Sequence, residues 1–304
     1  MQKNLTSNLN IMKNKCLLLL AWLLCAFITS CEKAMLNENT PTNEENVNVV
    51  FRVSPFSQIS FASSQTKRAP TRVEEVCSRI SFAIFDGNTK VKNVNQTIGD
   101  EGFGTLSLTI PKGKYQLIAI AHNGTASATI SSPNKITFPN NKCTDTFYIC
   151  QDFTVSTNSE YDLTLKRAVS MFRLLIEDSI PTSVTQIKFY YTGGSSTFDA
   201  VSGYGCVNSK QTEIRIITDE MRKNGTKLDV FSFPHADEDT LKMTITAQTS
   251  SEATVKERTF ANIPIKLNSI TQYSGTFFEA TSTEGDIDLH FKVDTTWVQY
   301  SHRY

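Results

Sequence analysis

The sequence predicts an all-β protein with two tandem β-sandwich domains, and two observations predict it. The first is a hydrophobic period of two: Val47, Val49, Phe51 and Val53 are apolar, with polar residues such as Asn48 between them. Alternation of this kind is typical of strands that bury one face. The second is that such short segments follow one another between turn residues without a sustained helical pattern, which favours sandwiches over mixed folds.

The predicted strands run along the whole chain after the first 46 residues. Residues 106–110 and 115–121 form the clearest hairpin, because Pro111 and Gly113 supply the turn between them. The second strand of this hairpin is apolar on both faces, so we expect it at the centre of a sheet. The only helical turn that we expect lies near residues 219–224. The expected strands are 47–53, 80–85, 106–110, 115–121, 146–149, 161–165, 169–176, 185–191, 213–217, 228–233, 241–248, 255–260, 270–279 and 287–293.

The chain divides into four segments. Residues 1–30 form a signal segment, and residues 31–46 are rich in Asn, Glu, Thr and Pro, which predicts a disordered tether. Two sandwiches follow, at 47–158 and 159–304, and the polar stretch 154–159 marks the boundary between them. Any duplication that relates the two sandwiches is too diverged to be visible in the sequence.

The N-terminal segment has the pattern of a bacterial lipoprotein signal. Lys13 and Lys15 give a positive region, residues 16–28 are apolar, and small residues precede Cys31. The apolar run is too short to cross about 30 Å of hydrocarbon comfortably as a permanent helix. We expect translation to start at Met12 and lipid chains on Cys31 to anchor the mature protein, because several acyl chains bind a membrane stably. The alternative is an ordinary secretory signal that is cleaved elsewhere.

Charge and cysteine content narrow the class of protein. Thirty basic and thirty acidic residues balance, so neither nucleic acid nor an anionic membrane surface is an electrostatically favoured partner. We expect at most one disulfide, within the first domain, and buried free thiols are the alternative. No CxxC pair is present, which argues against a zinc site. When the signal segment is removed and Cys31 carries lipid, four cysteines remain in an oxidising compartment: Cys77, Cys143, Cys150 and Cys206.

No set of residues makes a case for catalysis, so we expect no enzyme activity, no cofactor and no metal site. The histidines lie far apart, and none stands in a metal-binding spacing. Gly193 and Gly194 follow a predicted strand but no helix opens after them, which favours a flexible turn over a phosphate site. The acidic cluster 235–239 is interpreted as a solvated hairpin tip, with a calcium loop as the alternative.

Three stretches resemble the fimbrial subunits of the Bacteroidales type V pilus. Residues 106–123 match the hairpin of that family's first domain, with the pattern LxLxIPxGxYxLxAxAxN. Residues 165–170 (LxRAVS) look like the opening strand of its second domain, and residues 263–277 (IPIKLNxITxYxGxF) look like a strand pair near its end. The chain is most similar to the branch whose members keep a lipid anchor. The resemblance implies two transthyretin-like sandwiches with Ig-like Greek-key topology and a role in pilus assembly by strand complementation.

The resemblance also implies how a subunit enters the fibre. Subunits that polymerise are cut after a basic residue, which removes the first strand and opens a groove for a neighbour's strand, whereas uncut subunits keep their lipid and anchor the fibre. Arg68 and Arg72 lie in the polar loop after the first strand and are the candidate cleavage residues. The alternative is that both arginines are surface charges. The candidate removable strand carries Val47, Val49, Phe51 and Val53.

The C-terminal end favours an anchor. After the strand 287–293 no long alternating strand remains to donate to a neighbour, which favours a terminal subunit, and the lipid favours the base of the fibre. We therefore expect a non-enzymatic outer-membrane lipoprotein, anchored through acylated Cys31 and exposed at the cell surface. Its expected partners are a fimbrial stalk subunit, bound by β-strand complementation, and outer-membrane lipid, with no nucleic acid.

Two other functions stay open. One is a stalk or tip pilin that a protease processes. The other is a surface glycan-binding lipoprotein of a polysaccharide-uptake system, which would share the lipid signal, the tether and the sandwiches. Aromatic residues around one loop could present rings to a sugar, although strand aromatics that alternate usually fill a core. These residues are Tyr190, Tyr191, Phe198 and Tyr204.

Overall fold

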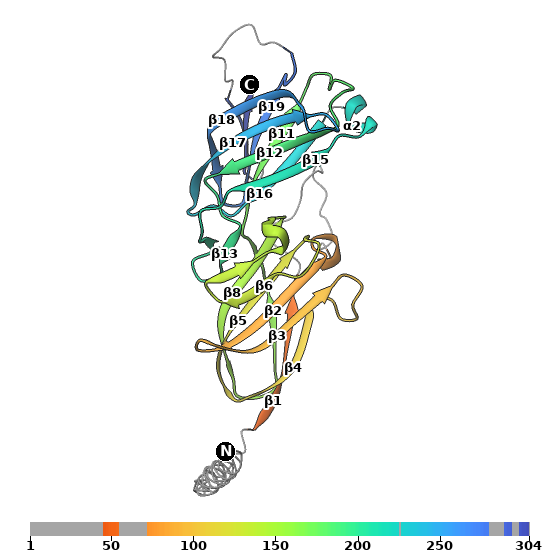
Figure 1. The fold of residues 1–304 in the computed structure, drawn as a ribbon. Coiled ribbons are helices and arrows are strands. Elements are labelled where there is room, and N and C mark those ends of the chain that lie inside the picture. The colour runs from red at the N-terminus through yellow and green to blue at the C-terminus, as the bar shows by residue number, and fades with distance from the viewer. Residues whose placement is uncertain (1–44, 55–71, 225, 280–288, 294–297, 304) are drawn as a thin grey trace, which may run out of the picture. The chain divides into compact units, whose positions relative to one another are not determined.

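The structure is a computed structural model, and it describes residues 45–54, 72–224, 226–279, 289–293 and 298–303 (Figure 1). The predicted lipoprotein signal with Met12 and Cys31, and the candidate cleavage residue Arg68, lie outside these residues. Nearly all regular structure in the described part is β, and its α-helix is α2 (Asp219–Asn224), where the sequence predicts a helical turn. Among these residues no helix is long and apolar enough to span a membrane.

Two sheets form the first sandwich. The smaller has the order β4-β1-β9, with β4 (Thr105–Pro111), β1 (Asn46–Val53) and β9 (Ser159–Leu163). The larger has the order β10-β8-β5-β2-β3, with β10 (Lys166–Arg167), β8 (Thr146–Val155), β5 (Gly113–His122), β2 (Arg79–Asp86) and β3 (Thr89–Thr97). The core lies between the sheets, where Phe51, Phe82 and Leu117 are fully buried. The central position that the sequence predicts for 115–121 is confirmed, because β5 lies between β8 and β2. The predicted hairpin of 106–110 with 115–121 is wrong, because β4 and β5 lie in different sheets and the turn between them crosses the sandwich.

Two further sheets form the second sandwich. One has the order β16-β11-β19-β21-β20, with β16 (Thr226–Ser232), β11 (Ser170–Ile176), β19 (Ser269–Gly275), β21 (Val298–Arg303) and β20 (Leu289–Val293). The other has the order β15-β12-β17-β18, with β15 (Gln211–Ile216), β12 (Gln186–Thr192), β17 (Glu238–Gln248) and β18 (Thr254–Lys266). The C-terminal strand that the sequence predicts is therefore part of the second sandwich as β20. The expectation that no further strand follows it is wrong, because β21 follows and pairs with β19. The core of the second sandwich contains Phe172, Phe189 and Phe277.

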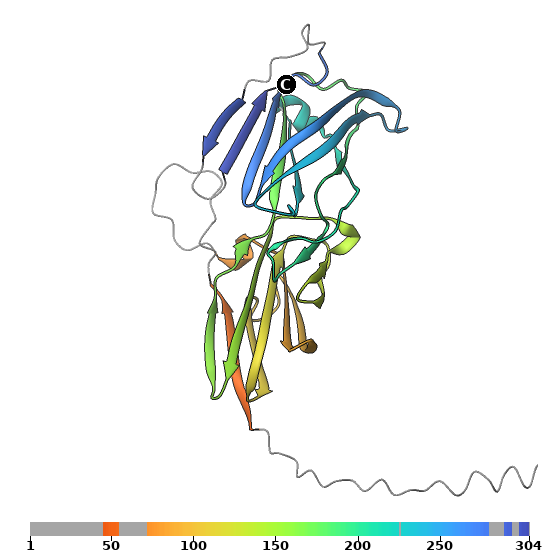
Figure 2. The same cartoon turned by 90° about the vertical axis from the view of Figure 1, so that its left-hand side faces the viewer.

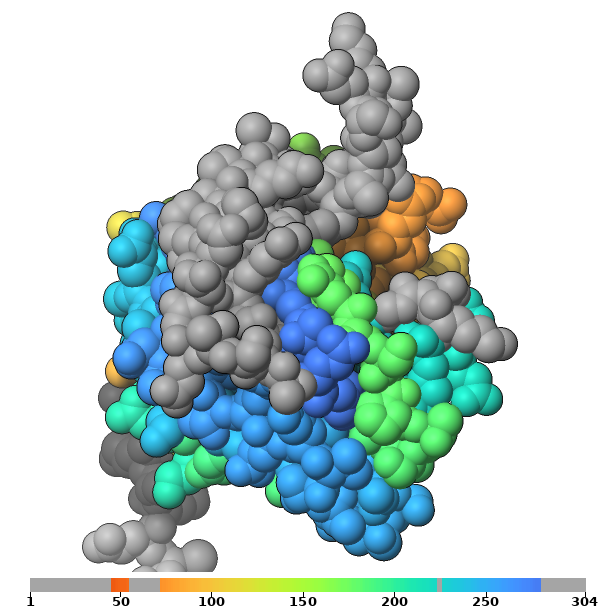
Figure 3. Space-filling model, turned by 90° about the horizontal axis from the view of Figure 1, so that it is seen from above, coloured from red at the N-terminus to blue at the C-terminus, as the bar shows by residue number. Residues whose placement is uncertain are grey.

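Hydrogen bonds join the segment that follows β19 to the segment that follows β11. The carboxylate of Asp178 accepts hydrogen bonds from the backbone N–H groups of Phe277, Phe278 and Glu279, at 2.7, 2.6 and 2.9 Å. Seen from above, the blue segment that follows β19 accordingly lies beside the green segment that follows β11 (Figure 3). These three bonds satisfy backbone donors where the strand ends.

The two sandwiches share one strand topology. In each, the first strand lies between an antiparallel neighbour and a parallel one: β1 between β4 and β9, and β11 between β16 and β19. In the facing sheets the order β3-β2-β5-β8 corresponds to the order β15-β12-β17-β18. The strand pairing thus reveals an internal duplication that the sequence does not.

A small sheet connects the two sandwiches. It has the order β14-β13-β7-β6, with β14 (Tyr204–Gly205), β13 (Thr197–Asp199), β7 (Lys135–Thr137) and β6 (Thr129–Ser132). The connecting pair is β7 with β13, where Ile136 lies opposite Phe198. Phe198 packs against Tyr148 and Phe233, with ring centroids 4.7 and 5.0 Å away. One buried cluster therefore includes side chains from both sandwiches.

The strand after the predicted domain boundary lies with the first sandwich. The sequence assigns residue 159 onward to the second sandwich, but β9 pairs with β1, and Leu163 and Leu165 are buried in the first core. The polar stretch 154–159 therefore links β8 to β9 within one sandwich. A period of two identifies a strand but not its neighbour, which is why the sequence places this strand on the other side of the boundary.

All four cysteines of the described chain are free, in agreement with the free-thiol alternative. Cys77 and Cys143 are buried, and burial raises the pKa of each thiol to about 12. Both thiols therefore stay protonated at neutral pH, which makes them poor nucleophiles. Cys150 is half-buried and Cys206 is exposed.

Candidate functional site

The first strand of the described chain, β1, is the central strand of the smaller sheet in the first sandwich. β1 pairs antiparallel with β4, from Asn46 opposite Pro111 to Arg52 opposite Thr105. On its other side it pairs in parallel with β9, from Val49 opposite Ser159 onward. Figure 2 shows β1 (orange) between its two neighbours. Because β1 is the central strand, β4 and β9 have no pairing with each other.

The alternate side chains of β1 face the core, as the sequence predicts. Val49 and Phe51 are 0% exposed, and Val47 and Val53 are nearly as buried. The ring of Phe51 meets Phe153 edge to face at 5.0 Å and stacks on Tyr161 at 5.3 Å. Burial of this kind stabilises by about 1.5 to 3 kcal/mol for each large apolar side chain. The side chains of β1 are therefore a substantial part of the first core.

Polar contacts hold the outer face of β1. The backbone N–H of Asn48 donates to Asn158 Oδ1 at 2.9 Å, and Thr109 Oγ1 donates to Asn48 Oδ1 at 2.6 Å. Arg52 binds Glu160 through two hydrogen bonds, one of them from Nη2 to Oε1 at 3.0 Å. The hydrogen bond from Arg52 lowers the pKa of Glu160. Both side chains are exposed, so the pair orients β1 against β9 more than it stabilises the fold.

Arg72 stands where the described chain resumes after β1. Its side chain is 76% exposed, and its Nε lies 3.6 Å from Glu74 Oε2. The short 3₁₀ turn η1 (Val73–Glu75) follows, and Val76 and Cys77 after it are buried. Arg72 is thus an accessible basic residue directly before a packed segment, whereas Arg68 lies outside the described residues.

Two of the stretches with the pilus-like pattern meet at Arg167, a contact that the sequence analysis does not anticipate. Arg167 Nη1 donates to Asn268 Oδ1 at 3.1 Å, while its Nε and Nη2 donate to Asp145 at 2.7 and 3.0 Å. The backbone N–H of Asn268 also donates to the carbonyl oxygen of Val169 at 3.0 Å. No local signal points to this contact, because Arg167 follows Lys166 in a two-residue strand, between two segments that the sequence predicts as strands.

The acidic cluster 235–239 does not form a metal site in the structure. Asp239 Oδ2 lies 2.9 Å from His235 Nδ1, Tyr204 donates to Asp237 Oδ1 at 2.9 Å, and Lys266 donates to Glu238 at 2.9 Å. In the described ranges no group of three or more His, Cys, Asp or Glu side chains could hold a metal ion. The cluster is also not a hairpin tip, because β16 before it and β17 after it lie in different sheets.

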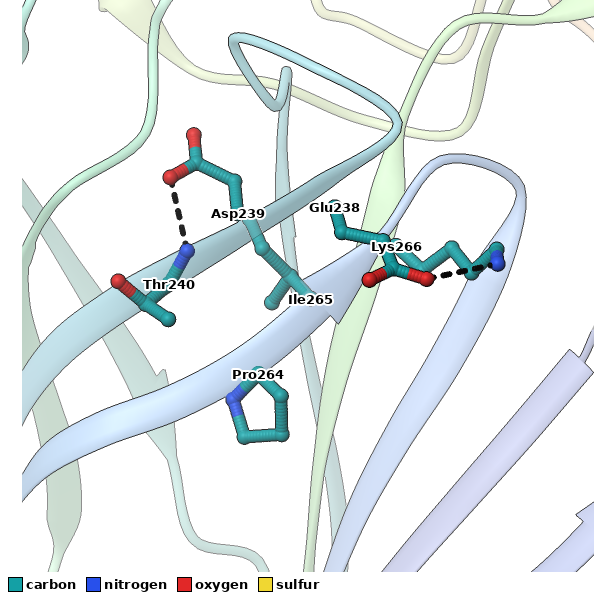
Figure 4. Close-up of a pocket in the computed structure, with 6 residues that line it drawn as sticks. All are labelled: Glu238, Asp239, Thr240, Pro264, Ile265 and Lys266. Atoms are coloured by element: carbon teal, nitrogen blue, oxygen red, sulfur yellow. Dashed lines mark hydrogen bonds and ion pairs between the residues drawn. The ribbon is translucent and has the colours of Figure 1, made fainter.

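A cavity of about 340 Å³ lies beside this cluster, where β17 and β18 meet (Figure 4). Its described lining combines the ion pair of Glu238 and Lys266 with the apolar side chains of Pro264 and Ile265. No aromatic ring belongs to that lining, so these residues offer no stacking surface for a sugar.

The aromatic residues considered for sugar binding are not gathered on one surface. Tyr191 and Phe198 are 0% exposed and belong to two different buried clusters. Tyr190 is 40% exposed, and the hydroxyl of Tyr204 is bonded to Asp237. Tyr191 and Phe198 therefore fill a core, which is the usual role of aromatic residues that alternate along strands.

Two sandwiches of one topology, joined by a shared sheet and with a central first strand, define a tandem β-sandwich protein. The chain belongs to the family described as fimbrillin-A associated anchor proteins Mfa1 and Mfa2, whose model matches residues 58–301. Membership confirms the resemblance to fimbrial subunits and identifies a fimbrial protein of the cell envelope. A search of curated proteins found no match.

Solved structures with low sequence identity also resemble the chain. A candidate adhesin from Bacteroides ovatus has a TM-score of 0.48 and 11% identity, over 72% of this chain and 84% of that one. A candidate polysaccharide-binding protein from Bacteroides thetaiotaomicron has a TM-score of 0.47 and 9% identity, over 69% and 79%. The fimbrial anchor protein Mfa2 from Porphyromonas gingivalis has a TM-score of 0.38 and 9% identity, over 70% and 82%.

Proposed function

We propose that the chain is the base anchor of a fimbrial fibre. In this proposal it is a non-enzymatic lipoprotein that holds the fibre to the outer membrane through acylated Cys31 and binds a stalk subunit by strand addition. The family supports a fimbrial role, and the lipoprotein pattern before Cys31 supplies the membrane attachment. The predicted tether 31–46 separates the lipid from the first sandwich.

The observation that supports the proposal is that β1 is paired on both sides and buried in the first core. This strand follows the tether directly, pairs with neighbours on both sides and buries four alternate side chains. A subunit that keeps β1 has a closed first sandwich and a continuous chain from the lipid to the core. Such a subunit can resist pulling on the fibre, because force on the sandwich is transmitted to the membrane through covalent bonds.

Processing is the alternative, and the exposure of Arg72 favours it. Cleavage after Arg68 or Arg72 would separate β1 and the lipid from the rest of the chain. The product would be a stalk or tip pilin with an open groove between β4 and β9. An unpaired groove of this kind would be prone to aggregate until a partner strand filled it.

Replacement of the lipidated cysteine tests the anchoring role. We expect Cys31→Ala to release assembled fibres into the medium while the soluble part stays folded. Cys206→Ala is the matched control, because it removes an exposed thiol elsewhere in the chain and should leave fibres on the cells. Fibres that stay cell-bound in the Cys31→Ala strain would contradict the anchor function.

The intact mass of the protein recovered from outer membranes separates the anchor from a processed pilin. An acylated chain that begins at Cys31 supports the anchor. A chain that begins at Ala69 or Val73 supports cleavage after Arg68 or Arg72.

A further inference from the structure

The geometry points to the outer edge of β9 as the surface where the stalk subunit adds its strand, in parallel with β9. This inference rests on the proposed anchor function and specifies where the partner binds. In an uncut anchor β1 already occupies the space between β4 and β9. A partner strand that leaves β1 in place therefore needs a free sheet edge, and the sheet that follows the predicted tether ends at β4 and β9.

The second sandwich shows how such a strand fits. β19 occupies the same place in the shared topology as β9, and its outer edge carries β21 in parallel, from Ser269 opposite Val298 to Ser274 opposite Arg303. Figure 2 shows β21 and β20 (dark blue) extending the upper sheet, whereas the lower sheet ends at β9. The other edge of the lower sheet, β4, corresponds to β16, which carries no added strand in the described chain. The duplication therefore favours β9 over β4.

The backbone of β9 is oriented for pairing. The carbonyl oxygen of Leu163 accepts a hydrogen bond from the N–H of Ser54 at 2.9 Å, so this residue directs its backbone groups toward β1. Backbone groups alternate between the two sides of a strand. Glu160 and Asp162 therefore direct their N–H and C=O groups away from β1, where no strand of the described chain pairs with them.

The side chains of β9 define the chemistry of the partner strand. Glu160 and Asp162 are exposed on the outer face, while Tyr161 and Leu163 face the core. Glu160 is already paired with Arg52 of β1, so Asp162 is the carboxylate that a basic residue of an added strand can meet. Such a strand gains most if apolar residues alternate with a Lys or Arg beside Asp162. Asp162 also disfavours pairing of this edge between two copies of the chain, since charged side chains on an edge strand discourage edge-to-edge pairing.

A proline in β9 tests the edge without disturbing β1. Asp162→Pro removes an N–H that faces outward, which edge strands tolerate. We expect the variant to stay in the membrane and to melt like the wild type. The ratio of released to cell-bound fibre should rise about tenfold or more, which corresponds to about 1.4 kcal/mol of lost binding.

Ile216→Pro is the matched control. Ile216 lies on β15, an edge strand of the second sandwich, and the N–H of Ile217 faces β12 because it donates to the carbonyl oxygen of Thr185 at 2.9 Å. The N–H of Ile216 therefore faces outward like that of Asp162, at an edge where we expect no partner. This variant should retain fibres as the wild type does.

A charge variant keeps the test decisive if the proline unfolds the protein. Asp162→Lys retains the N–H but places a positive charge beside the basic partner strand, so it should also release fibres. Retention of fibres by Asp162→Lys and by folded Asp162→Pro overturns the β9 proposal. If Cys31→Ala releases fibres in the same strain, only the docking edge is wrong; if it also retains them, the anchor function fails as well.

Discussion

Arg167 binds Asp145 through two parallel hydrogen bonds, from Nε to Oδ1 at 2.7 Å and from Nη2 to Oδ2 at 3.0 Å. Asp145 directly precedes β8 of the first sandwich, whereas Asn268, which accepts the bond from Nη1, lies in the turn between β18 and β19 of the second. The side chain of Arg167 is 2% exposed, and its Cζ lies 4.6 Å from the ring centroid of Phe147. The buried charge of Arg167 therefore adds a polar contact between the two sandwiches to the small sheet and the buried cluster that connect them.

The first prediction concerns this connection. Asp145→Asn leaves the buried guanidinium of Arg167 without a compensating charge, and loss of one partner from a buried pair costs about 3 to 5 kcal/mol. We expect that loss in the free energy of unfolding, measured by urea denaturation. We also expect the two sandwiches to unfold at separate midpoints, because their connection is weakened.

Asp229→Asn is the control for the connection. Arg173 and Asp229 form a pair with the same two distances, 2.7 and 3.0 Å, but this pair lies within one sheet of the second sandwich, whereas Arg167 of the first sandwich also donates to Asn268 of the second. This variant should lose stability without separating the two midpoints. A loss of less than about 1 kcal/mol in Asp145→Asn would contradict the proposed strength of the connection.

The second prediction concerns Gly193, which the sequence analysis places in a flexible turn. A Cβ atom at Gly193 would lie 2.2 Å from the carbonyl oxygen of Thr240, so the position is tightly packed. Gly99 has the same backbone φ of +96° but no atom within 4 Å of its Cβ position. Both alanine variants strain the backbone by about 1 to 3 kcal/mol. Only Gly193→Ala should add a steric cost, so its melting temperature should fall clearly below that of Gly99→Ala.

The sequence predicts strands well but not their neighbours. The alternation in β1 and the apolar run in β5 identify both strands and their buried faces, because side-chain period depends on local sequence. The pairing of β9 with β1 and of β7 with β13 joins segments far apart in the chain. No local pattern encodes such contacts, which is why the sequence neither shows the duplication nor places the end of the first sandwich.

The candidate site likewise has some features that the sequence predicts and others that depend on contacts between distant segments. The buried residues of β1 can be predicted one by one, since each alternate position is apolar. The contact of Arg167 with Asp145 and Asn268 cannot, because its partners lie 22 and 101 positions away. The outer edge of β9 is likewise visible only after the strand order is known.

The third prediction concerns the packing of β1. Phe51→Ala removes the ring that contacts both Phe153 and Tyr161, and truncation of a buried Phe costs about 3 to 5 kcal/mol. Val50→Ala changes the neighbouring, half-buried position and should cost less than about 1.5 kcal/mol. Chemical denaturation measures both values, and hydrogen exchange of the β1 amides should accelerate in the Phe51 variant alone. Equal effects of the two substitutions would show that β1 does not depend on its core face.

The fourth prediction is a pH dependence that originates at His122. The backbone N–H of Gly124 donates to His122 Nδ1 at 2.9 Å, which assigns the proton of the neutral ring to Nε2. That Nε2 is buried with no hydrogen-bond partner, and the ring meets Phe138 edge to face at 5.3 Å. Burial, with a smaller contribution from the charge of Arg79, lowers the pKa of His122 from 6.5 to about 4.

The sign of the effect follows from where each state binds the proton. Below pH 6.5 the unfolded chain binds a proton at His122, while the folded chain does not bind it until about pH 4. The unfolding free energy of the protein therefore has its full value above pH 6.5. It falls by about 3 kcal/mol in total as the pH decreases toward 4. His122→Phe removes the titrating group. The unfolding free energy of the wild type should therefore decrease relative to that of the variant as the pH falls from 7 to 4.5. A difference that stays constant over this range would mean that His122 already binds its proton in the folded protein.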